Sequence, residues 1–403
     1  MEIGIDKIGF YTPHLYVDMN KLAYERNVEP EKFTIGIGQE KMAIAPLTQD
    51  PVTMAANAAL EILDEEDKEK IDFVLFGTES GIDQSKSAAV YVHRLLGLNA
   101  QARAVEVKQA CYGATAAIQM AKGHIALNPE SRVLVLGSDI ARYGLNTGGE
   151  ATQGAGAIAM VVSKDPSIMV FEGPSAYLTD DVMDFWRPAY SGEAFVDGKL
   201  SNEQYIAFFS RAWDQYKAKT GLELADFDAF SFHLPYTKMG KKALKAVLDE
   251  GSEADSERLL ANHQIGAIYN RNVGNIYTAS LYLSLLSLLE QNEDLQDGSR
   301  IGLFSYGSGA VGELFAGRLK NGYREHLHVE RHRELFATRK EVTVSEYEEI
   351  FQETLPTDGS RLELDIHQDP ANVCLSGIEG HARQYVNKAS GIREEKVAAH
   401  VER

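Results

Sequence analysis

Apolar positions along the chain fall into two patterns that predict strands alternating with helices. Continuous apolar runs of strand length are typical of strands buried on both faces of a sheet. Between them lie longer segments with apolar residues at helical spacing. The predicted strands are residues 3–10, 71–77, 132–136, 227–232 and 300–304, with another around Val105, and the predicted helices are residues 19–26, 51–63, 87–96 and 278–290, with another after Cys111.

The same order of elements occurs twice, once in each half of the chain. In each half, a strand ends in a polar residue, a second polar residue opens a helix, and a Gly-x-Gly-Ala loop enters the last strand. The polar residues are Glu79 and Cys111 in the first half and His233 and Asn275 in the second, and the loops are residues 154–157 and 307–310. This duplication predicts an α/β fold with two similar mixed sheets and helices between and outside them. We expect the four polar residues to converge between the halves.

The chain length fits one large duplicated fold or two to three domains. The chain has 403 residues, against a prior of about 150 residues per domain. We expect a first half at 1–165, a connecting and capping insertion at 166–225, and a second half at 226–403 that ends in a charged helical segment. The last thirteen residues, 391–403, are polar and are expected to form a loosely ordered tail.

Charge and cysteine usage exclude several classes of protein. The net charge of -19 argues against a binder of nucleic acid or of an anionic membrane, because both need a positive surface. Cys111 and Cys374 are far apart and have no metal-ligand spacing, so no zinc or iron–sulfur site is expected. The richest apolar segment, 279–290, is shorter than the roughly 20 residues that span a bilayer. With no signal-peptide pattern at the N-terminus, a cytoplasmic protein with reduced thiols is expected.

Cys111 lies where an apolar strand turns into an alanine-rich helix. Unpaired N–H groups at a helix N-terminus favour the thiolate, which is one way to make a cysteine nucleophilic. A small buried core residue is the other interpretation, because free cysteine is among the most buried residue types. This stretch by itself leaves both interpretations open.

The other repeated residues suggest chemistry only in combination. Glu79, partly removed from water, would tend to hold its proton and could serve as acid and base in turn. His233 could polarise a carbonyl oxygen, and the N–H groups of the glycine loops could form an oxyanion hole. Each residue alone also has a structural explanation. Glu79 could cap a helix or face solvent, His233 could be a buried core residue, and Asn275 could be an N-cap, while the glycine loops could be tight turns. Together with Cys111 they form a set suited to acyl transfer and carbon–carbon bond formation.

A local basic group stands out in this acidic chain. It consists of Lys238, Lys241 and Lys242 and follows closely after His233. A solvated helix face explains it, and so would the phosphates of a carrier such as coenzyme A.

Longer motifs around these residues are similar to those of a known family. They are IGIGQEKMA at 35–43, FGTESGIDQSKSAA at 76–89, ACYGATAA at 110–117, DIARYGLNTGGEATQGAGA at 139–157, DFWRP at 184–188, VDGKLSNEQY at 196–205, FHLPYTKMGKKAL at 232–244, VGNIYTASLYL at 273–283 and GLFSYGSGAV at 302–311. The chain resembles the bacterial type of the hydroxymethylglutaryl-CoA synthase family, within the thiolase-fold superfamily. The resemblance covers about residues 1–318 in order, is looser past about 321, and departs from the family pattern over 365–403.

The resemblance implies a five-layered α-β-α-β-α thiolase fold, a homodimer, and a role in the mevalonate pathway. It implies that acetyl-CoA acylates Cys111, that Glu79 removes a methyl proton, and that the carbanion attacks acetoacetyl-CoA, whose ketone is polarised by His233. Asn275 would assist His233, and the backbone around Cys111 and Ser308 would hold the thioester oxygen. Hydrolysis would release 3-hydroxy-3-methylglutaryl-CoA with no metal or redox cofactor. The substrate and coenzyme A channel would be lined by Tyr143, Thr152, Ser201, Lys238 and Lys242.

Three other functions remain open at the level of the sequence. A decarboxylating ketoacyl synthase of the same superfamily also uses cysteine, histidine and asparagine but needs no base equivalent to Glu79. A polyketide-pathway relative would act on a carrier-protein-bound ketone, and the lysines near 240 do not discriminate because both carriers present phosphate. A non-catalytic paralogue would only bind coenzyme A esters or a partner, which the intact Cys111, Glu79 and His233 argue against.

Overall fold

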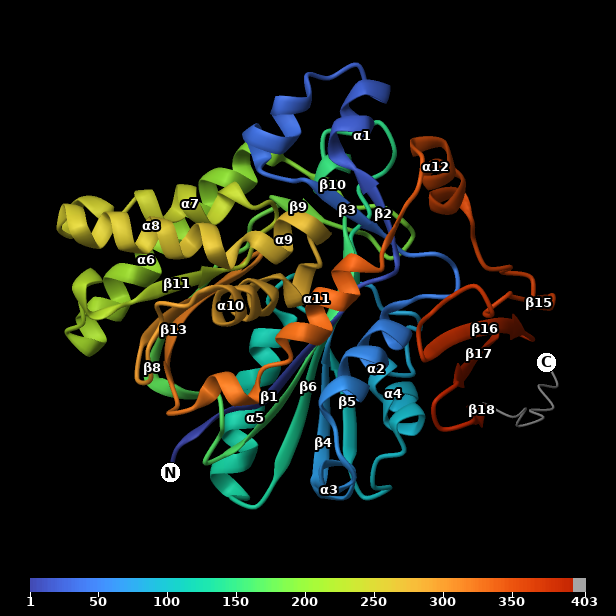
Figure 1. Cartoon of the computed structure of the whole chain (residues 1–403), viewed down its shortest axis with the longest axis horizontal. Helices are drawn as coiled ribbons and strands as arrows, with labels where there is room; N and C mark the ends of the chain where they lie inside the picture. The colour runs from blue at the N-terminus through green and yellow to red at the C-terminus, as the bar shows by residue number, and fades with distance from the viewer. Residues whose placement is uncertain (394–403) are drawn as a thin grey trace.

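The computed structural model describes residues 1–393 and contains a nine-stranded mixed sheet that runs through both halves of the chain (Figure 1). The strands are ordered β11-β12-β13-β8-β1-β7-β6-β4-β5. Their bounds are β1 (Ile3–Tyr11), β4 (Ile71–Gly77), β5 (Arg103–Val107), β6 (Arg132–Ile140), β7 (Ala155–Lys164), β8 (Met169–Thr179), β11 (Ala229–Phe232), β12 (Arg300–Gly307) and β13 (Val311–Leu319).

The sheet is built from two equivalent halves. In the first half β4 is parallel to β6, and β6 is antiparallel to β7. In the second half β11 is parallel to β12, and β12 is antiparallel to β13. A short antiparallel pairing of β1 with β8, at Gly4 with Val170 and Ile5 with Met169, joins the two expected mixed sheets by hydrogen bonds. The approach is so close at Gly4 that an added Cβ would lie 1.8 Å from the Met169 carbonyl oxygen.

Helices fill the space between the halves and cover their outer faces (Figure 1). Helix α5 (Gly113–Leu127) packs on β4 and β6, and α10 (Ser280–Gln291) packs on β11 and β12. The two helices touch where the hydroxyls of Thr115 and Tyr282 lie 2.7 Å apart. Helix α2 (Pro51–Ile62) covers β1 and β7, and α6 (Gly198–Thr220) covers β8 and β13. This arrangement confirms the predicted duplicated, thiolase-like α/β fold.

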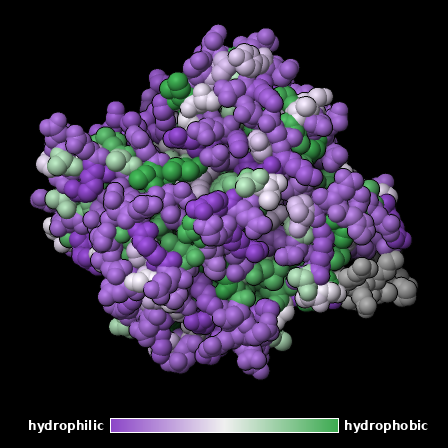
Figure 2. Space-filling view, in the orientation of Figure 1, coloured by the Kyte–Doolittle hydropathy of each residue, from purple (hydrophilic) through white to green (hydrophobic). Residues whose placement is uncertain are grey.

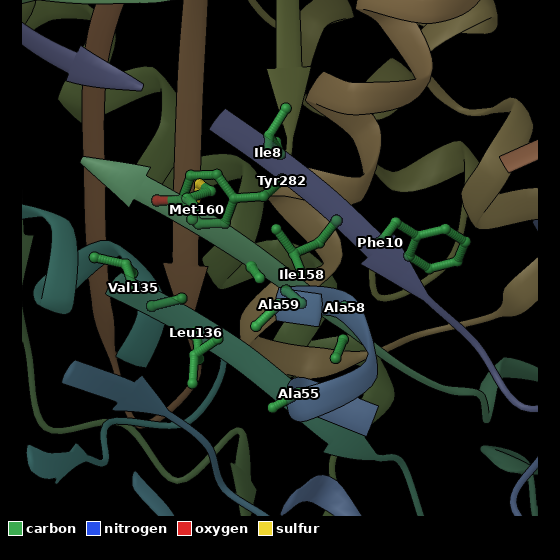
Figure 3. Close-up of a cluster of buried hydrophobic side chains, with 14 of the residues drawn as sticks. Ile8, Phe10, Ala55, Ala58, Ala59, Val135, Leu136, Ile158, Met160 and Tyr282 are labelled. Carbon is green, nitrogen blue, oxygen red and sulfur yellow. The ribbon is translucent and has the colours of Figure 1, made fainter. Parts of the chain in front are cut away.

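The first half is closely packed because its outer helix presents alanines to the sheet (Figure 3). Ala55, Ala58 and Ala59 of α2 are fully buried, as are Ile158 of β7 and Leu136 of β6. Small side chains let the helix axis lie near the strands, and protein interiors tolerate few voids. The remaining helices are α1 (Met19–Glu25), α3 (Glu65–Lys70), α4 (Ala88–Leu96), α7 (Lys238–Lys245), α8 (Glu253–Gly266), α9 (Ile268–Val273), α11 (Val329–Ala337) and α12 (Val344–Gln352).

The segment at 166–225 contributes to the second half of the sheet and not only to a cap. It contains β8 and α6 together with a hairpin of β9 (Phe185–Trp186) and β10 (Phe195–Val196). The boundaries at 165 and 225 stay predictions. The charged C-terminal segment has the expected helices α11 and α12 but continues into strands. These strands are β15 (Leu362–Glu363), β16 (Val373–Glu379), β17 (Ala382–Asn387) and β18 (Ile392–Arg393), which form a four-stranded sheet.

Three further short strands, β2 (Leu15–Asp18), β3 (Lys41–Ile44) and β14 (Lys340–Glu341), form a separate sheet. Of the tail predicted at 391–403, residues 394–403 lie outside the described part of the chain.

No helix within 1–393 is long and apolar enough to cross a membrane. The face seen in Figure 2 is mainly hydrophilic, with separate apolar patches.

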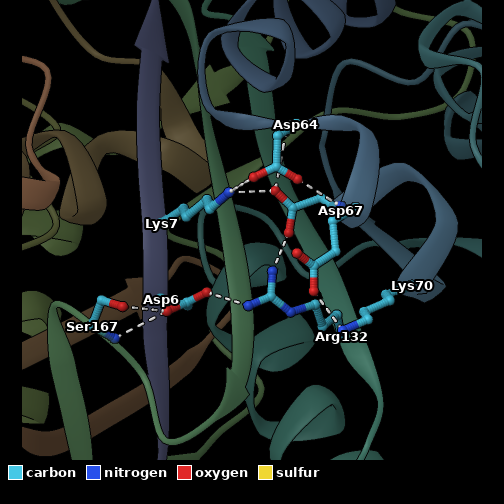
Figure 4. A network of polar contacts seen from close by, with 8 residues as sticks. Asp6, Lys7, Asp64, Asp67, Lys70, Arg132 and Ser167 are labelled. Atoms are coloured by element: carbon cyan, nitrogen blue, oxygen red, sulfur yellow. Dashed lines mark hydrogen bonds and ion pairs between the residues drawn. The ribbon is translucent and has the colours of Figure 1, made fainter.

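An ionic network ties the N-terminal ends of β6 and α3 to β1 (Figure 4). Arg132 of β6 donates to Asp6 of β1 at 2.7 Å and to Asp67 of α3. Lys7 donates to the same Asp67 at 2.5 Å and to Asp64 at 2.7 Å. The Asp67 side chain is fully buried, so its charge depends on these two cations for compensation.

We expect Arg132→Ala to lower the free energy of unfolding by about 3 kcal/mol, because it leaves the buried Asp6 without its counter-ion and the buried Asp67 with Lys7 alone. The matched control is Arg333→Ala, which removes an exposed pair with Glu330 and should change stability by at most about 0.5 kcal/mol. Urea unfolding measures both variants. Equal effects of the two substitutions would show that the network contributes nothing.

Candidate active site

Glu79 and Cys111 are brought into contact by the approach of α5 to the end of β4. Glu79 lies two residues after β4, and Cys111 lies two residues before α5. The Cys111 thiol donates a hydrogen bond to Glu79 Oε1 at 3.1 Å. A Cβ added at Gly77 would lie 2.4 Å from the backbone nitrogen of Ala114. The glycine at the strand end therefore allows the helix start to come close enough for this contact.

The loop that carries Glu79 is held by a buried carboxylate, Asp139, at the end of β6. Asp139 Oδ1 accepts hydrogen bonds from the backbone N–H groups of Glu79 and Ser80, each at 2.9 Å. Its Oδ2 accepts from the Thr278 hydroxyl at 2.6 Å and the Thr278 backbone N–H at 3.1 Å. Thr278 belongs to the 3-10 helix η5 (Tyr277–Ala279) that precedes α10. One side chain thus joins the Glu79 loop to the second half of the chain.

Burial and negative charge keep both members of the Glu79–Cys111 pair protonated. Burial, with the nearby Asp139 charge, raises the pKa of Glu79 to about 8 from an ordinary value of 4.5, although the Cys111 hydrogen bond and the Arg187 charge oppose the shift. Burial, followed by the Glu79 charge, raises the pKa of the Cys111 thiol well above its ordinary value. The direction is opposite to the one expected for a cysteine at a helix N-terminus, because burial of the sulfur and the nearby carboxyls favour the thiol. The expectation that Glu79 holds its proton is confirmed in direction.

His233 follows β11 and presents a neutral imidazole. Its backbone N–H donates to the Phe304 carbonyl at 2.8 Å, and its carbonyl accepts from the Tyr205 hydroxyl at 2.6 Å. Burial lowers the pKa of His233 to about 3, so the ring is uncharged near pH 7. Its Nδ1 is buried without a hydrogen-bond partner among residues 1–393. The Tyr205 ring lies 6.4 Å from the imidazole, and burial raises the pKa of its phenol well above the ordinary value.

Asn275 is oriented by the turn that leads into α10. Its Oδ1 accepts from the Tyr277 backbone N–H at 2.8 Å and from the Ser280 hydroxyl at 2.9 Å. The N-cap interpretation is thus satisfied by the oxygen, while Nδ2 is buried with no acceptor among the described residues. A buried donor without a partner is rare in proteins. Asn275 therefore has a free donor that a ligand oxygen could accept.

An aromatic wall lies beside the sulfur. Tyr143, Phe185 and Tyr277 pack edge to face with ring centroids 5.9–6.0 Å apart, and Cys111 is part of the same buried cluster. Burial is the main cause that raises the pKa of the Tyr143 phenol, and the nearby Tyr277 and Asn275 side chains oppose the shift. Tyr143 of the first half thus lies close to Asn275 of the second.

The second glycine loop is anchored by another buried carboxylate. Asp184 accepts from the Gly309 backbone N–H at 2.8 Å and from the Tyr306 hydroxyl at 2.9 Å. The Ser308 carbonyl accepts from the Gln109 side chain at 3.3 Å, two residues before Cys111. These contacts hold the Ser308 loop beside the cysteine.

The remaining predicted channel residues lie on three elements. The Thr152 carbonyl accepts from the Asn275 backbone N–H at 3.1 Å. Ser201 is half-buried in the first turn of α6. Lys238 begins α7 and is half-buried, whereas Lys242 is exposed and donates to the Tyr236 hydroxyl at 2.8 Å.

Sequence reasoning missed Asp139, Asp184, Tyr277 and Arg187. All four residues lie within the family motifs at 139–157, 184–188 and 273–283, so these motifs could have indicated them. Within 1–393, no group of three or more His, Cys, Asp and Glu side chains is arranged to hold a metal ion.

Comparison with known proteins identifies the family. The model of the N-terminal part of hydroxymethylglutaryl-coenzyme A synthase matches residues 1–167, and the model of its C-terminal part matches 169–265 and 256–358. The chain is 54% identical over 387 residues to the hydroxymethylglutaryl-CoA synthase of Enterococcus faecalis, with 96% of this chain and 100% of the relative covered. The chain belongs to the hydroxymethylglutaryl-CoA synthase family. This confirms the predicted family and the predicted acyltransferase class.

Solved structures of this hydroxymethylglutaryl-CoA synthase family agree with the fold. An HMG-CoA synthase complexed with CoA matches with a TM-score of 0.93 at 45% identity, covering 96% of this chain and 100% of that chain. A polyketide biosynthesis 3-hydroxy-3-methylglutaryl-ACP synthase of Bacillus subtilis is 32% identical over 374 residues, which cover 87% of this chain and 88% of the relative.

The raised pKa of Glu79 predicts that Glu79→Gln stabilises the protein at alkaline pH. Between about pH 4.5 and 8 the unfolded carboxyl ionises while the folded one does not, so the stability contributed by this group falls as the pH rises. Gln does not titrate, and its amide oxygen can still accept from Cys111. We expect the melting temperature of the variant to equal that of the wild type at pH 4.5 and to exceed it by at least about 2 °C at pH 8.5. Calorimetry measures this difference, with the exposed Glu330→Gln as control; a difference that does not depend on pH would contradict it.

Proposed function

We propose that this chain condenses acetyl-CoA with acetoacetyl-CoA and water to form 3-hydroxy-3-methylglutaryl-CoA through an acetyl-Cys111 intermediate. The observation that carries the proposal is the 3.1 Å contact between the Cys111 thiol and Glu79, because one carboxyl serves both the nucleophile and the carbon acid. Family membership supports the reaction, and a solved relative named MvaS is complexed with 3-hydroxy-3-methylglutaryl coenzyme A.

Acylation begins with the fraction of Glu79 that is ionised near pH 7. This carboxylate accepts the Cys111 thiol proton while the sulfur attacks the thioester carbon of acetyl-CoA. The C–S bond to coenzyme A breaks, and Glu79 returns the proton to the leaving thiolate. A pKa of about 8 suits a group that takes and gives a proton near neutral pH.

Condensation uses the same carboxylate as a base. Glu79 removes a proton from the methyl group of acetyl-Cys111, and the carbanion attacks the ketone carbon of acetoacetyl-CoA. Backbone N–H groups around Cys111 and Ser308 would stabilise the enolate oxygen. The ketone oxygen ends as a hydroxyl and gains the proton.

His233 and Asn275 are proposed to hold the ketone oxygen of acetoacetyl-CoA. Each has a buried nitrogen without a partner in the described structure, and the His233 ring is neutral near pH 7. A neutral imidazole donates a hydrogen bond to developing negative charge without bringing a full charge into the site. Water then attacks the enzyme thioester, which releases the product carboxylate and regenerates the thiol.

Tyr143, Thr152, Ser201, Lys238 and Lys242 are proposed to line the path of the substrates, with the lysines facing the phosphates of coenzyme A. No resident cofactor is proposed, because the coenzyme A esters are substrates. We also propose a cytoplasmic homodimer. The edge strand β5 supports a pairing of two copies, since Val105 is 42% exposed there and an unpaired edge favours association with another strand.

The central test separates acylation from condensation. We expect the wild type to gain one acetyl group on Cys111 after brief exposure to acetyl-CoA, as seen by mass spectrometry, and Cys111→Ala to gain none. Glu79→Gln should still form the adduct, more slowly, but should lose condensation by at least about 100-fold. Full condensation by Glu79→Gln, or no adduct on the wild type, would overturn the proposal.

A carrier-protein acceptor is the second candidate, favoured by the similarity to the Bacillus subtilis ACP synthase. The higher identity to the Enterococcus faecalis CoA enzyme leads us to expect kcat/KM for acetoacetyl-CoA at least about tenfold above that for acetoacetyl carrier protein. Steady-state kinetics with both acceptors measures the ratio, and the reverse preference would establish the carrier-protein function.

A further inference from the structure

Arg187 lies at the wall of the site, directly after β9. The preceding residues are anchored: Asp184 holds Gly309 and Tyr306, and Phe185 packs against Tyr277 at 5.9 Å. Arg187 is half-buried. The backbone on its N-terminal side is thus fixed next to the cluster that contains the nucleophile.

The Arg187 guanidinium makes no hydrogen bond or ion pair within residues 1–393. Two other cations of this region, Arg142 and Lys242, have partners. Arg142 donates to the Phe351 carbonyl and lies 3.9 Å from the centre of the Phe351 ring, and Lys242 donates to Tyr236. A half-buried guanidinium with unused donors is poorly solvated, so it favours an anionic ligand.

The positive charge of Arg187 acts electrostatically on groups of the site. It lowers the pKa of Glu79 against the effect of burial and acts in the same direction on the Tyr277 phenol. The other fixed charges that act on this pair are the buried carboxyls Asp139 and Asp184, which raise the pKa of Cys111 further beyond the effect of burial and of Glu79. An anion at the sulfur would therefore be repelled by these carboxyls and attracted by Arg187.

The proposed reaction creates such an anion. The acyl groups of both substrates are uncharged, whereas hydrolysis of the thioester on Cys111 converts the acyl carbon into a carboxylate next to Glu79. A carboxylate removed from water needs a cation and hydrogen bonds. The planar guanidinium can give two parallel hydrogen bonds to a carboxylate.

We propose that Arg187 binds the carboxylate that hydrolysis creates on the product and so determines the selectivity of the site for an acyl-CoA that ends in a carboxylate. The inference rests on the proposed function, because only the final hydrolysis supplies this group. Arg187 is a product-binding residue in this scheme and is not required for acylation of Cys111.

The test compares two ligands that differ only in the carboxylate. Binding of 3-hydroxy-3-methylglutaryl-CoA and of 3-hydroxy-3-methylbutyryl-CoA is measured by calorimetry on Cys111→Ala, which cannot react, and on Cys111→Ala with Arg187→Gln. We expect Arg187→Gln to lower the affinity for 3-hydroxy-3-methylglutaryl-CoA by about tenfold or more and the affinity for the carboxylate-free ligand by less than about twofold. Arg187→Lys should recover part of the loss, because it restores the charge without the planar fork.

Arg211→Gln, an exposed arginine on α6, is the matched control and should change neither affinity. Equal weakening of both ligands by Arg187→Gln, or no weakening of either, would overturn the assignment. Failure of the proposed function looks different, because the wild type would then form no acetyl-Cys111. Retained acetylation on Arg187→Gln with the ligand-specific loss supports both conclusions.

Discussion

The site depends on one buried carboxylate, Asp139, that is shared between the two halves of the chain. A carboxylate removed from water costs several kcal/mol unless hydrogen bonds replace the lost hydration. Its donors are the backbone N–H groups and the Thr78 and Ser80 hydroxyls after β4, and Thr278 before α10. Both segments must be in their native positions for the charge to be satisfied. The same contact therefore fixes Glu79 in the first half and the turn that orients Asn275 in the second.

The carboxyls that organise the site also set its resting state. Asp139 and Asp184 are fully buried, and their charges add to desolvation in keeping Cys111 as a thiol. Among residues 1–393, Glu79 is the carboxyl that accepts a hydrogen bond from the Cys111 thiol. In the proposed reaction, the cysteine would therefore become reactive when Glu79 is ionised.

The sequence predicted those elements and site residues that depend on short, continuous stretches of the chain. The run at 71–77 is a strand with those bounds, since its residues other than Asp72 are apolar or glycine and polar residues flank it. The internal repeat led to Glu79, Cys111, His233 and Asn275 because each stands at the junction of an element and a loop. The roles of these residues stay predictions until they are measured. What the repeat could not provide is the pairing between distant segments.

The residues that were missed have partners far away in the chain. β6 was expected to end at 136, because Ser138 and Asp139 interrupt its apolar run, and the structure continues the strand to Ile140. The Asp139 carboxylate can be buried there because donors from other segments satisfy it, which no local pattern reveals. The C-terminal strands are a similar case: Tyr385 and Arg383 both donate to Asp50 at the start of α2.

The distance between Asp139 and Thr278 also bears on how the protein is made. The two residues are separated by 139 positions. At about 5–20 residues per second, a ribosome needs on the order of 10 s to add that length of chain. By the end of this interval the first half has all its own strands, yet Asp139 still lacks the two donors of Thr278. A chain that stops before Thr278 would therefore keep the contacts of Asp139 to the Glu79 loop and lack those that join this loop to the turn before α10.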